Sequence, residues 1–257
     1  MITRLRRAAG ISRYLGQRLI MDSVLDPDRA SAFRLQLESQ RDAERRQALI
    51  PVRCLTDLWP APGRVTVEAD ALQDGNPTLI ELFCLGAIAR GVDAHAMFEI
   101  GTFDGSTTLQ LALNSPPEAV VYTLDLAAEH IDCTRSPLLP RERRYVMNPS
   151  PGSRFRGTPI EWKIRQLFGD SAIFPAGPLA GQMDLVVVDG SHALDYVRSD
   201  SRLAQTLVRP GGWLVWHDYG VWPDVTIGLL ELARTFPLVQ LESTTLVVTQ
   251  IPPSARR

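Results

Sequence analysis

The sequence predicts an α/β fold built on a mostly parallel sheet, and three observations support this prediction. Short apolar runs of strand length alternate with segments whose apolar residues recur at helical spacing, from about residue 79 to residue 250. The run DLVVVD at 184–189 is almost continuously apolar, which is typical of a parallel strand covered on both faces. Glycines or polar residues follow the strands, where open α/β sheets bind ligands. We therefore expect helices on both faces of one sheet.

Residues 1–60 are expected to form an N-terminal helical extension. They are charged and carry no strand signal, and RDAERR at 41–46 marks an exposed helix face. The stretch PAPG at 60–63 indicates a turn before the main domain at 61–257. The extension is either a solvated helix that covers a partner or the main domain, or a basic arm on a membrane surface or a transit receptor. A contact between two copies of the chain is a third candidate role.

The main domain is expected to open with a helix whose apolar stripe starts at Leu79 and whose C-cap is Gly91. Five strands are predicted at 97–100, 120–124, 163–168, 184–189 and 213–216. Helices between and after them are predicted at 106–113, 193–208 and 225–236. The runs PLVQLE and TTLVVTQI then form a C-terminal hairpin.

One segment, 126–160, has no strand or helix period and is rich in proline, glycine and arginine. It is too long for a simple loop, so we interpret it as a lid or acceptor-binding insert. Its arginines either clamp an acidic acceptor or are solvated: Arg135, Arg141, Arg143, Arg144, Arg154 and Arg156. The aromatic residues around the last predicted strand favour core packing over an acceptor pocket: Trp213, Trp216, Tyr219 and Trp222.

Composition narrows the class of protein. A net charge of -2 provides no overall positive potential that would attract nucleic acid. No apolar segment reaches membrane-spanning length. Cys54, Cys84 and Cys133 are far apart and form no CxxC pair, so we expect a reducing, cytoplasmic location.

Three of the predicted strands are followed by candidate binding residues. Gly101 and Gly105 bracket the turn after the first strand, where glycine permits close approach of a ligand to the backbone. We expect a bulky residue at Gly101 to abolish ligand binding without unfolding the protein. Asp125 closes the second strand, and Asp170 follows the third. The alternative to the glycine site is a purely structural turn. Asp125 is alternatively a helix N-cap or a surface carboxylate, and Asp170 is alternatively part of a capped turn.

Two further strands end in VVVDGSH (186–192) and WLVWHDY (213–219). These ends bring carboxylates and imidazoles to one edge of the sheet, namely Asp189, His192, His217 and Asp218. Such a group either holds a divalent cation, provides a histidine base oriented by an aspartate, or only caps the strand ends.

The motifs FEIGTFDGSTT, TLDL and LFGDS resemble those of class I S-adenosylmethionine-dependent methyltransferases over residues 79–250. The resemblance implies a Rossmann-like, seven-stranded sheet in the order 3-2-1-4-5-7-6 with the last strand antiparallel. It implies S-adenosyl-L-methionine as cofactor, with Asp125 on the ribose and Asp170 on the adenine amino group. The cofactor residues that it implies are Glu99, Gly101, Thr102, Phe103, Gly105, Ser106, Asp125, Asp170, Ser171 and Asp189.

The sheet-edge residues resemble the metal-dependent O-methyltransferases, including the catechol and macrolide-sugar enzymes. By that resemblance Asp189, His217 and Asp218 bind Mg²⁺, although His217 stands where an acid is usual. His192 occupies the position of the catalytic lysine and suits proton removal near neutral pH.

We therefore expect methyl transfer to a small-molecule hydroxyl of a sugar, polyketide or phenolic compound. His192, Asp189 and His217 are the expected catalytic residues. The alternatives are a metal-free enzyme with a histidine base and a hydroxyl or amine acceptor, and a non-catalytic S-adenosylmethionine-binding protein. A nicotinamide dehydrogenase is disfavoured because GxGxxG is missing.

Overall fold

The computed structural model describes residues 50–61, 63–70 and 72–253. These described residues belong to one compact unit. The predicted helical extension, its basic arm and its contact with a second copy fall mainly on residues 1–49, outside the described residues. No helix in the described ranges has the length and apolar character that crossing a membrane requires.

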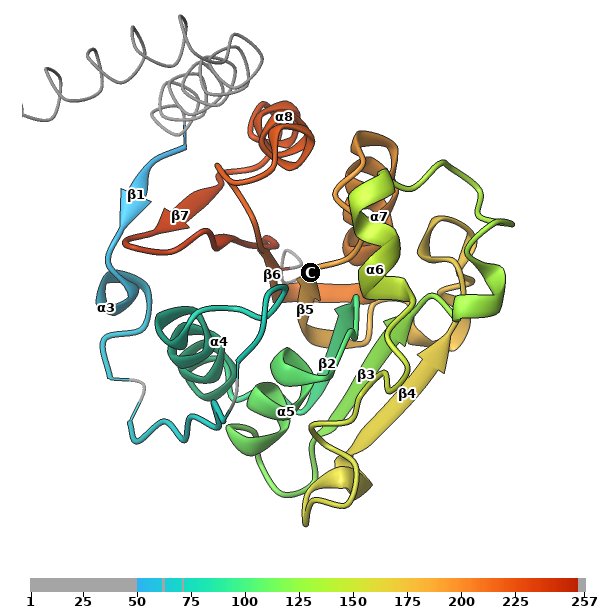
Figure 1. The fold of residues 1–257 in the computed structure, drawn as a ribbon. Helices are drawn as coiled ribbons and strands as arrows, with labels where there is room; N and C mark the ends of the chain where they lie inside the picture. The colour runs from blue at the N-terminus through green and yellow to red at the C-terminus, as the bar shows by residue number, and fades with distance from the viewer. Residues whose placement is uncertain (1–49, 62, 71, 254–257) are drawn as a thin grey trace, which may run out of the picture. The chain divides into compact units, whose positions relative to one another are not determined.

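The described residues contain one eight-stranded sheet, drawn as arrows in Figure 1. From edge to edge the strands are β1 (Val52–Arg53), β7 (Val239–Leu241), β8 (Val247–Gln250), β6 (Val208–Trp216), β5 (Met183–Val188), β2 (Ala96–Ile100), β3 (Val120–Asp125) and β4 (Ile164–Phe168). Strand β8 is antiparallel to both neighbours, and the other pairs are parallel. Counted from β2, the strands follow the predicted order with the last one antiparallel, so the predicted fold class is confirmed.

Strand β1 corrects two predictions, the count of seven strands and the absence of a strand from residues 1–60. Val52 and Arg53 pair with Gln240 and Leu241 of β7. Both β1 residues are exposed, so the segment shows no apolar alternation that a pattern search can detect. The strand exists because an unpaired sheet edge is available beside it, which is a tertiary condition.

Helices cover both faces of the sheet (Figure 1). The longer ones are α4 (Leu79–Gly91), α5 (Ser106–Leu113), α7 (Leu194–Leu207) and α8 (Pro223–Leu232), and the short ones are α3 (Leu55–Leu58) and α6 (Arg143–Val146). Short 3₁₀ turns are η1 (Ala128–His130), η2 (Pro140–Glu142), η3 (Glu161–Lys163), η4 (Ser171–Ile173) and η5 (Gly177–Leu179). Helix α8 begins two residues before the predicted 225 because Pro223 suits the first helical turn.

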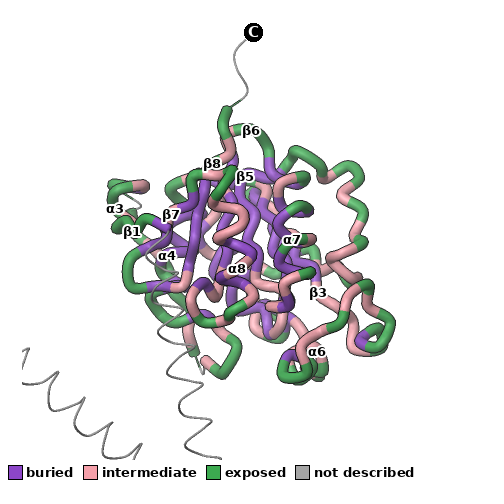
Figure 2. The backbone as a smooth tube through the Cα atoms, turned by 90° about the horizontal axis from the view of Figure 1, so that it is seen from above, coloured by how far each residue is buried: buried purple, intermediate pink, exposed green. Residues whose placement is uncertain are grey.

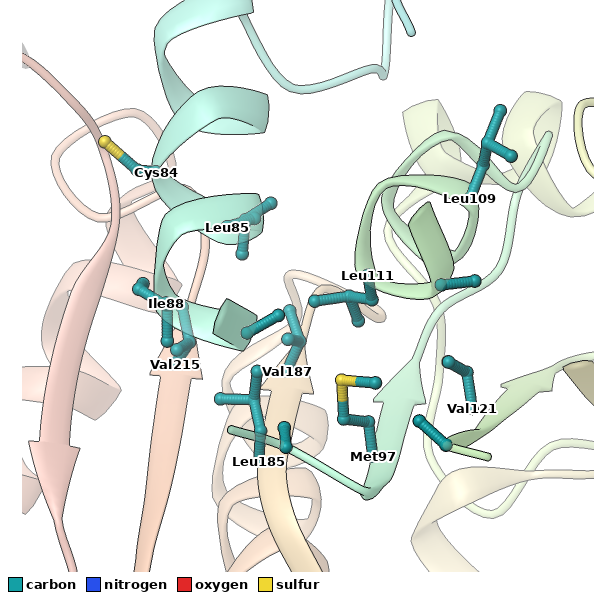
Figure 3. Packing of buried hydrophobic residues seen from close by; sticks show 14 of the residues in the cluster. Cys84, Leu85, Ile88, Met97, Leu109, Leu111, Val121, Leu185, Val187 and Val215 are labelled. Carbon is teal, nitrogen blue, oxygen red and sulfur yellow. The ribbon is translucent and has the colours of Figure 1, made fainter. Parts of the chain in front are cut away.

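The core consists of two apolar layers, one on each face of the sheet. All six residues of β5 are buried, as the apolar run predicts. Leu185 and Val187 pack in the layer beneath α4 and α5, shown in Figure 3. Val186 and Val188 point the other way, into the layer beneath α7 and α8. Figure 2 shows the same arrangement, with buried residues concentrated in the strands and exposed ones on the periphery.

The predicted C-cap at Gly91 is wrong. Gly91 is the last residue of α4, Val92 is the C-cap, and the left-handed backbone belongs to Asp93, with φ 51°. A Cβ at Gly91 would lie 2.4 Å from the ring of Trp59. Glycine is therefore required here by packing against Trp59, which sequence spacing does not reveal.

Candidate active site

Two adjoining cavities open at the carboxyl ends of the central strands. The first, here called the inner cavity, is bordered by Asp125, Gly169, Asp170, Ser171 and Tyr196, among others. The second, here called the outer cavity, is bordered by Glu99, Thr102, Ser106, Arg141, His217, Asp218 and Trp222, among others. Both cavities share Gly101, Phe103, Tyr145, Asp189, Gly190 and His192. A molecule that filled one cavity would therefore be presented to the contents of the other.

Gly101 forms the turn where β2 leaves the sheet. Its φ is 100°, and a Cβ at this position would lie 2.0 Å from the carbonyl oxygen of Asp189. The strand ends are locked there, because Asp189 N–H donates to Ile100 O over 2.8 Å. The expectation that a bulky residue at Gly101 leaves the fold intact conflicts with this geometry, since the clash is with backbone that cannot rotate away.

Gly105 borders neither cavity, unlike the other nine predicted cofactor residues. It has φ 90°, and a Cβ there would lie 2.6 Å from the ring of Phe155. The structure thus accounts for Gly105 through its packing against the insert.

Glu99 and Thr102 line the outer cavity from below and are almost wholly buried. Glu99 accepts hydrogen bonds from Thr108 Oγ1 and, over 2.6 Å, from Thr123 Oγ1. Thr102 Oγ1 lies 2.7 Å from the same Thr123 hydroxyl. Burial raises the pKa of Glu99 to about 8, although both hydrogen bonds oppose the shift. Glu99 is consequently neutral through much of the physiological pH range.

Asp125 and Asp170 border the inner cavity at the ends of β3 and β4. Burial raises the pKa of Asp125 to about 6, against hydrogen bonds from backbone N–H groups. The Asp170 carboxylate accepts from Ala172 N over 3.0 Å, from Tyr196 Oη over 2.9 Å and from the backbone N–H of Arg135 over 2.6 Å. The capped turn considered for Asp170 is therefore present, and it stands at the edge of the cavity.

Each ring nitrogen of the two histidines at the sheet edge faces a carboxylate. His192 Nδ1 lies 2.6 Å from Glu142 Oε1, and its Nε2 lies 2.7 Å from Asp218 Oδ2. His217 Nδ1 lies 3.1 Å from Asp189 Oδ1, and its Nε2 lies 3.3 Å from Glu81 Oε2. The structure thus brings together the four predicted sheet-edge residues.

These carboxylates favour the charged form of both imidazoles. Burial alone would lower the pKa of His192, but the hydrogen bonds with Asp218 and Glu142 outweigh it and raise that pKa to about 9. Burial is likewise outweighed at His217, where the charges of Asp189 and Asp218 hold the pKa well above its usual value. An imidazolium carries a proton on each ring nitrogen and has no lone pair, so in this arrangement Asp189 and Asp218 carry the proton-accepting atoms.

A possible cation site differs by one residue from the predicted set. Ligand atoms of Asp189, His192 and Asp218 lie within 4.8 Å of one another. The prediction had His217 in place of His192. The ring of His217 is instead held between Asp189 and Glu81, and it is almost wholly buried.

Sequence reasoning missed two carboxylates, Glu81 and Glu142. Glu81 belongs to a capping box, in which Thr78 N–H donates to Glu81 Oε2 over 2.8 Å. The spacing Thr-x-x-Glu before an apolar stripe indicates that cap, although not its contact with His217. Glu142 lies in the insert, where no pattern signals its role.

The aromatic and arginine clusters divide between core and cavity. Trp216 and Tyr219 are fully buried, and Trp213 packs against Trp59 at 4.6 Å between ring centroids. Trp222 alone of the four aromatic residues borders the outer cavity. Arg141 and Arg144 also border it, while other insert arginines are engaged elsewhere, for example Arg154 with Asp104 over 2.6 Å.

Residues 98–219 match the protein family described as a methyltransferase domain. The chain carries a methyltransferase domain. The matched region runs from β2 to Tyr219 and so includes the glycine turn, Asp125 and all four sheet-edge residues. The predicted methyltransferase identity is confirmed, and the cavities described above are those of this domain.

Solved structures similar to the methyltransferase domain include O-methyltransferases. The TomG enzyme of Streptomyces achromogenes, solved with S-adenosylmethionine, is 17% identical with a TM-score of 0.52 over 77% of this chain and 96% of TomG. An O-methyltransferase from Bacillus cereus, solved with S-adenosylhomocysteine, is 16% identical with a TM-score of 0.46 over 70% and 84%. Cofactor-bound Rv0187 from MTB is 17% identical with a TM-score of 0.45 over 91% and 95%. No curated protein matches the chain significantly. At this identity the likeness to TomG establishes the fold.

Proposed function

We propose that the domain transfers a methyl group from S-adenosyl-L-methionine to a hydroxyl of a small molecule. The observation that supports this most is the shared wall of the two cavities, where Gly101, Asp189 and His192 border both the inner and the outer cavity. TomG, which has the same fold, is an O-methyltransferase solved with that cofactor.

The cofactor is proposed to span both cavities. The ribose hydroxyls suit Asp125, and the adenine lies beside Asp170 and Ser171 in the inner cavity. The methionine end then reaches the first turn of α5, where Ser106 borders the outer cavity. Ser106 Oγ is buried without a hydrogen-bond partner among the described residues, and it can donate to a ligand carboxylate.

The acceptor is proposed to occupy the outer cavity beside Asp189 and Asp218. Its hydroxyl oxygen attacks the methyl carbon in line, the carbon–sulfur bond breaks, and the sulfonium leaves as a neutral thioether. The hydroxyl proton passes to the Asp189 carboxylate, which lies 3.1 Å from His217 Nδ1. Asp218 is the weaker base, because its burial is outweighed by His217 and His192, which lower its pKa below the usual range. Catalysis then rests on positioning and deprotonation, and no covalent enzyme intermediate is required.

Divalent-cation assistance is the second part of the proposal. Asp189, Asp218 and His192 offer two carboxylates and an imidazole, a donor set that suits Mn²⁺, Fe²⁺ or Zn²⁺ as well as Mg²⁺. A cation bound there would lower the pKa of the acceptor hydroxyl.

Four further expectations belong to this proposal. The acceptor is a small molecule, and nucleic acid is not a partner. The protein is located in the cytoplasm, and two copies contact each other through the N-terminal segment.

Calorimetric titration of the purified protein with S-adenosylmethionine tests the cofactor. We expect saturable binding, and binding that is absent in EDTA and in added Mn²⁺ alike would contradict the proposal. A screen of hydroxyl and amine compounds, read by S-adenosylhomocysteine formation, then tests the acceptor. Turnover of amines alone would contradict O-methylation, and cofactor binding without turnover of any compound would favour a non-catalytic binding protein.

A further inference from the structure

Two consecutive residues of the insert grip the ring of His192. Glu142 Oε1 lies within hydrogen-bond distance of its Nδ1. Arg141 packs on Trp222, whose ring in turn stacks on the imidazole. The rings of His192 and Trp222 stack with centroids 4.0 Å apart at an angle of 6°. Arg141 Cζ lies 3.5 Å from the centroid of the Trp222 ring. Because two groups this close cannot share a face, Trp222 is held between the imidazole and the guanidinium.

Glu142 is tied to the loop after β5 by more than one bond. Its side chain is buried, with 3% of the residue exposed. It accepts from the backbone N–H of His192 and, over 3.0 Å, from Ser191 Oγ, in addition to its contact with the imidazole. Glu142 thus makes three contacts with the loop after β5, about fifty residues away in the sequence, and these contacts fix the position of the His192 ring.

We infer that Glu142 is a positioning residue that turns His192 into a ligand for a divalent cation held with Asp189 and Asp218. The inference rests on the proposed function, since it concerns the cation of that site. A ligating histidine commonly donates its second ring N–H to a carboxylate, which fixes the tautomer and the ring orientation. Glu142 stands at the position of that carboxylate, 2.6 Å from Nδ1.

The geometry of His192 accounts for the choice of this histidine. A cation binds the neutral form of His192, in which Nδ1–H is donated to Glu142 and the lone pair lies on Nε2, the nitrogen that faces Asp218. The stacking contact with Trp222 fixes the plane of the imidazole ring, so that Nε2 stays directed toward Asp218. His217 is not part of this group, because the ligand atoms that lie within 4.8 Å of one another belong to Asp189, His192 and Asp218.

Titration of the full-length protein with Mn²⁺, followed by calorimetry, tests the inference. Glu142→Gln keeps an acceptor for Nδ1–H but removes the charge, so we expect Mn²⁺ affinity to fall by about 10- to 100-fold. Because Glu142 also borders the inner cavity, affinity for S-adenosylmethionine is measured separately without metal, and we expect Mn²⁺ affinity to fall by more than cofactor affinity. Glu161→Gln is the matched control, since Glu161 is another carboxylate near this segment that accepts a backbone N–H, from Gly157, and it is remote from the site.

Unchanged Mn²⁺ affinity in Glu142→Gln would overturn the inference, and so would a wild-type protein that binds no Mn²⁺. Neither result bears on cofactor binding, so failure of the inference is distinguishable from failure of the proposed function. If Glu142→Gln does not fold, Glu142→Asp provides the same test, because the shorter carboxylate keeps the charge and loses reach to Nδ1. It too should weaken Mn²⁺ binding while the circular dichroism spectrum is retained.

Discussion

At the scale of single residues, burial and close contact govern what the side chains near the site can do. Asp200 of α7 is fully buried, and neither of its carboxylate oxygens has a partner in hydrogen-bonding geometry among the described residues. It packs against the loop after β5, since its Oδ2 lies 2.9 Å from where a Cβ of Gly190 would be. Burial raises its pKa to about 7, with a smaller opposing effect of the Ser171 hydroxyl.

Asp200→Asn should therefore stabilise the protein at neutral pH. The folded pKa lies above the ordinary value of 3.8, so stability is fully present below about pH 4 and is lost as the pH rises to 7. Asparagine does not ionise, so the free energy of unfolding of the variant should exceed that of the wild type at neutral pH by about 4 kcal/mol at most. Urea unfolding at pH 4, 5.5 and 7.5 measures it. Asp195→Asn, an exposed change in the same helix, is the control. A variant less stable than wild type at pH 7.5 would contradict the prediction.

The glycine turn allows a second prediction at this scale. Gly101→Ala should cost more than about 3 kcal/mol of unfolding free energy, because the new methyl collides with the Asp189 carbonyl. Gly157→Ala is the control: its φ is 74°, but nothing lies within 4 Å of the added Cβ. It should cost only the left-handed strain, about 1 kcal/mol. Equal losses of unfolding free energy would show that backbone strain, and not the collision, limits position 101.

At the scale of elements, the start of α4 is connected to the active site. Glu81 Oε2 accepts from Thr78, while its Oε1 accepts from the backbone N–H and the hydroxyl of Thr245 over 2.8 and 2.7 Å. The same carboxylate lies opposite His217. Burial works against its ionisation, but the contact with His217 and these donors lower its pKa below the usual range. Glu81 therefore links a helix cap, the turn before β8 and the sheet edge.

Glu81→Gln should destabilise the protein by about 1–3 kcal/mol at pH 7, because buried donors lose a charged acceptor. Since the folded pKa is lowered, this contribution is present above the ordinary value of 4.5 and is lost as the pH falls. The difference in unfolding free energy from wild type should thus shrink between pH 6 and pH 3. Glu231→Gln, in an exposed pair with Arg198, should change little at any pH. A pH-independent difference for Glu81→Gln would point to packing instead of charge.

At the scale of the whole molecule, the insert joins the two cavities. Leu138, Tyr145 and Val146 border the inner cavity, and the neighbouring Glu142 holds His192 at the wall shared with the outer one. The insert therefore contacts both cavities, and we expect binding in one cavity to affect binding in the other.

We expect S-adenosylmethionine to raise the affinity for Mn²⁺ by about 5-fold or more, with the reverse effect of equal size because coupling is reciprocal. Calorimetric titration of each ligand in the presence and absence of the other measures both. Glu142→Gln should remove the coupling. Independent binding in the wild-type protein would show that the insert does not transmit occupancy between the cavities.

The central strands follow from local signals in the sequence, whereas their order followed from the resemblance to the methyltransferase family. The apolar run of β5 is buried on both faces as predicted, and the glycine turn, Asp125 and the sheet-edge residues lie at the strand ends where they were expected. The edge strand β1 was not predictable, since two exposed residues show no period. Gly91 was misread as a C-cap because its neighbour, Trp59, comes from another part of the chain.

By itself, the sequence determined the fold class, the methyltransferase family and the location of Asp189, His192, His217 and Asp218 at one edge of the sheet. Periodicity and motif spacing are local properties, and parallel strands deliver their ends to a common edge. Only the tertiary structure decided the carboxylate partners, Glu142 for His192 and Glu81 for His217. Those pairs join segments many residues apart, and their contact is created by packing, which no local pattern encodes.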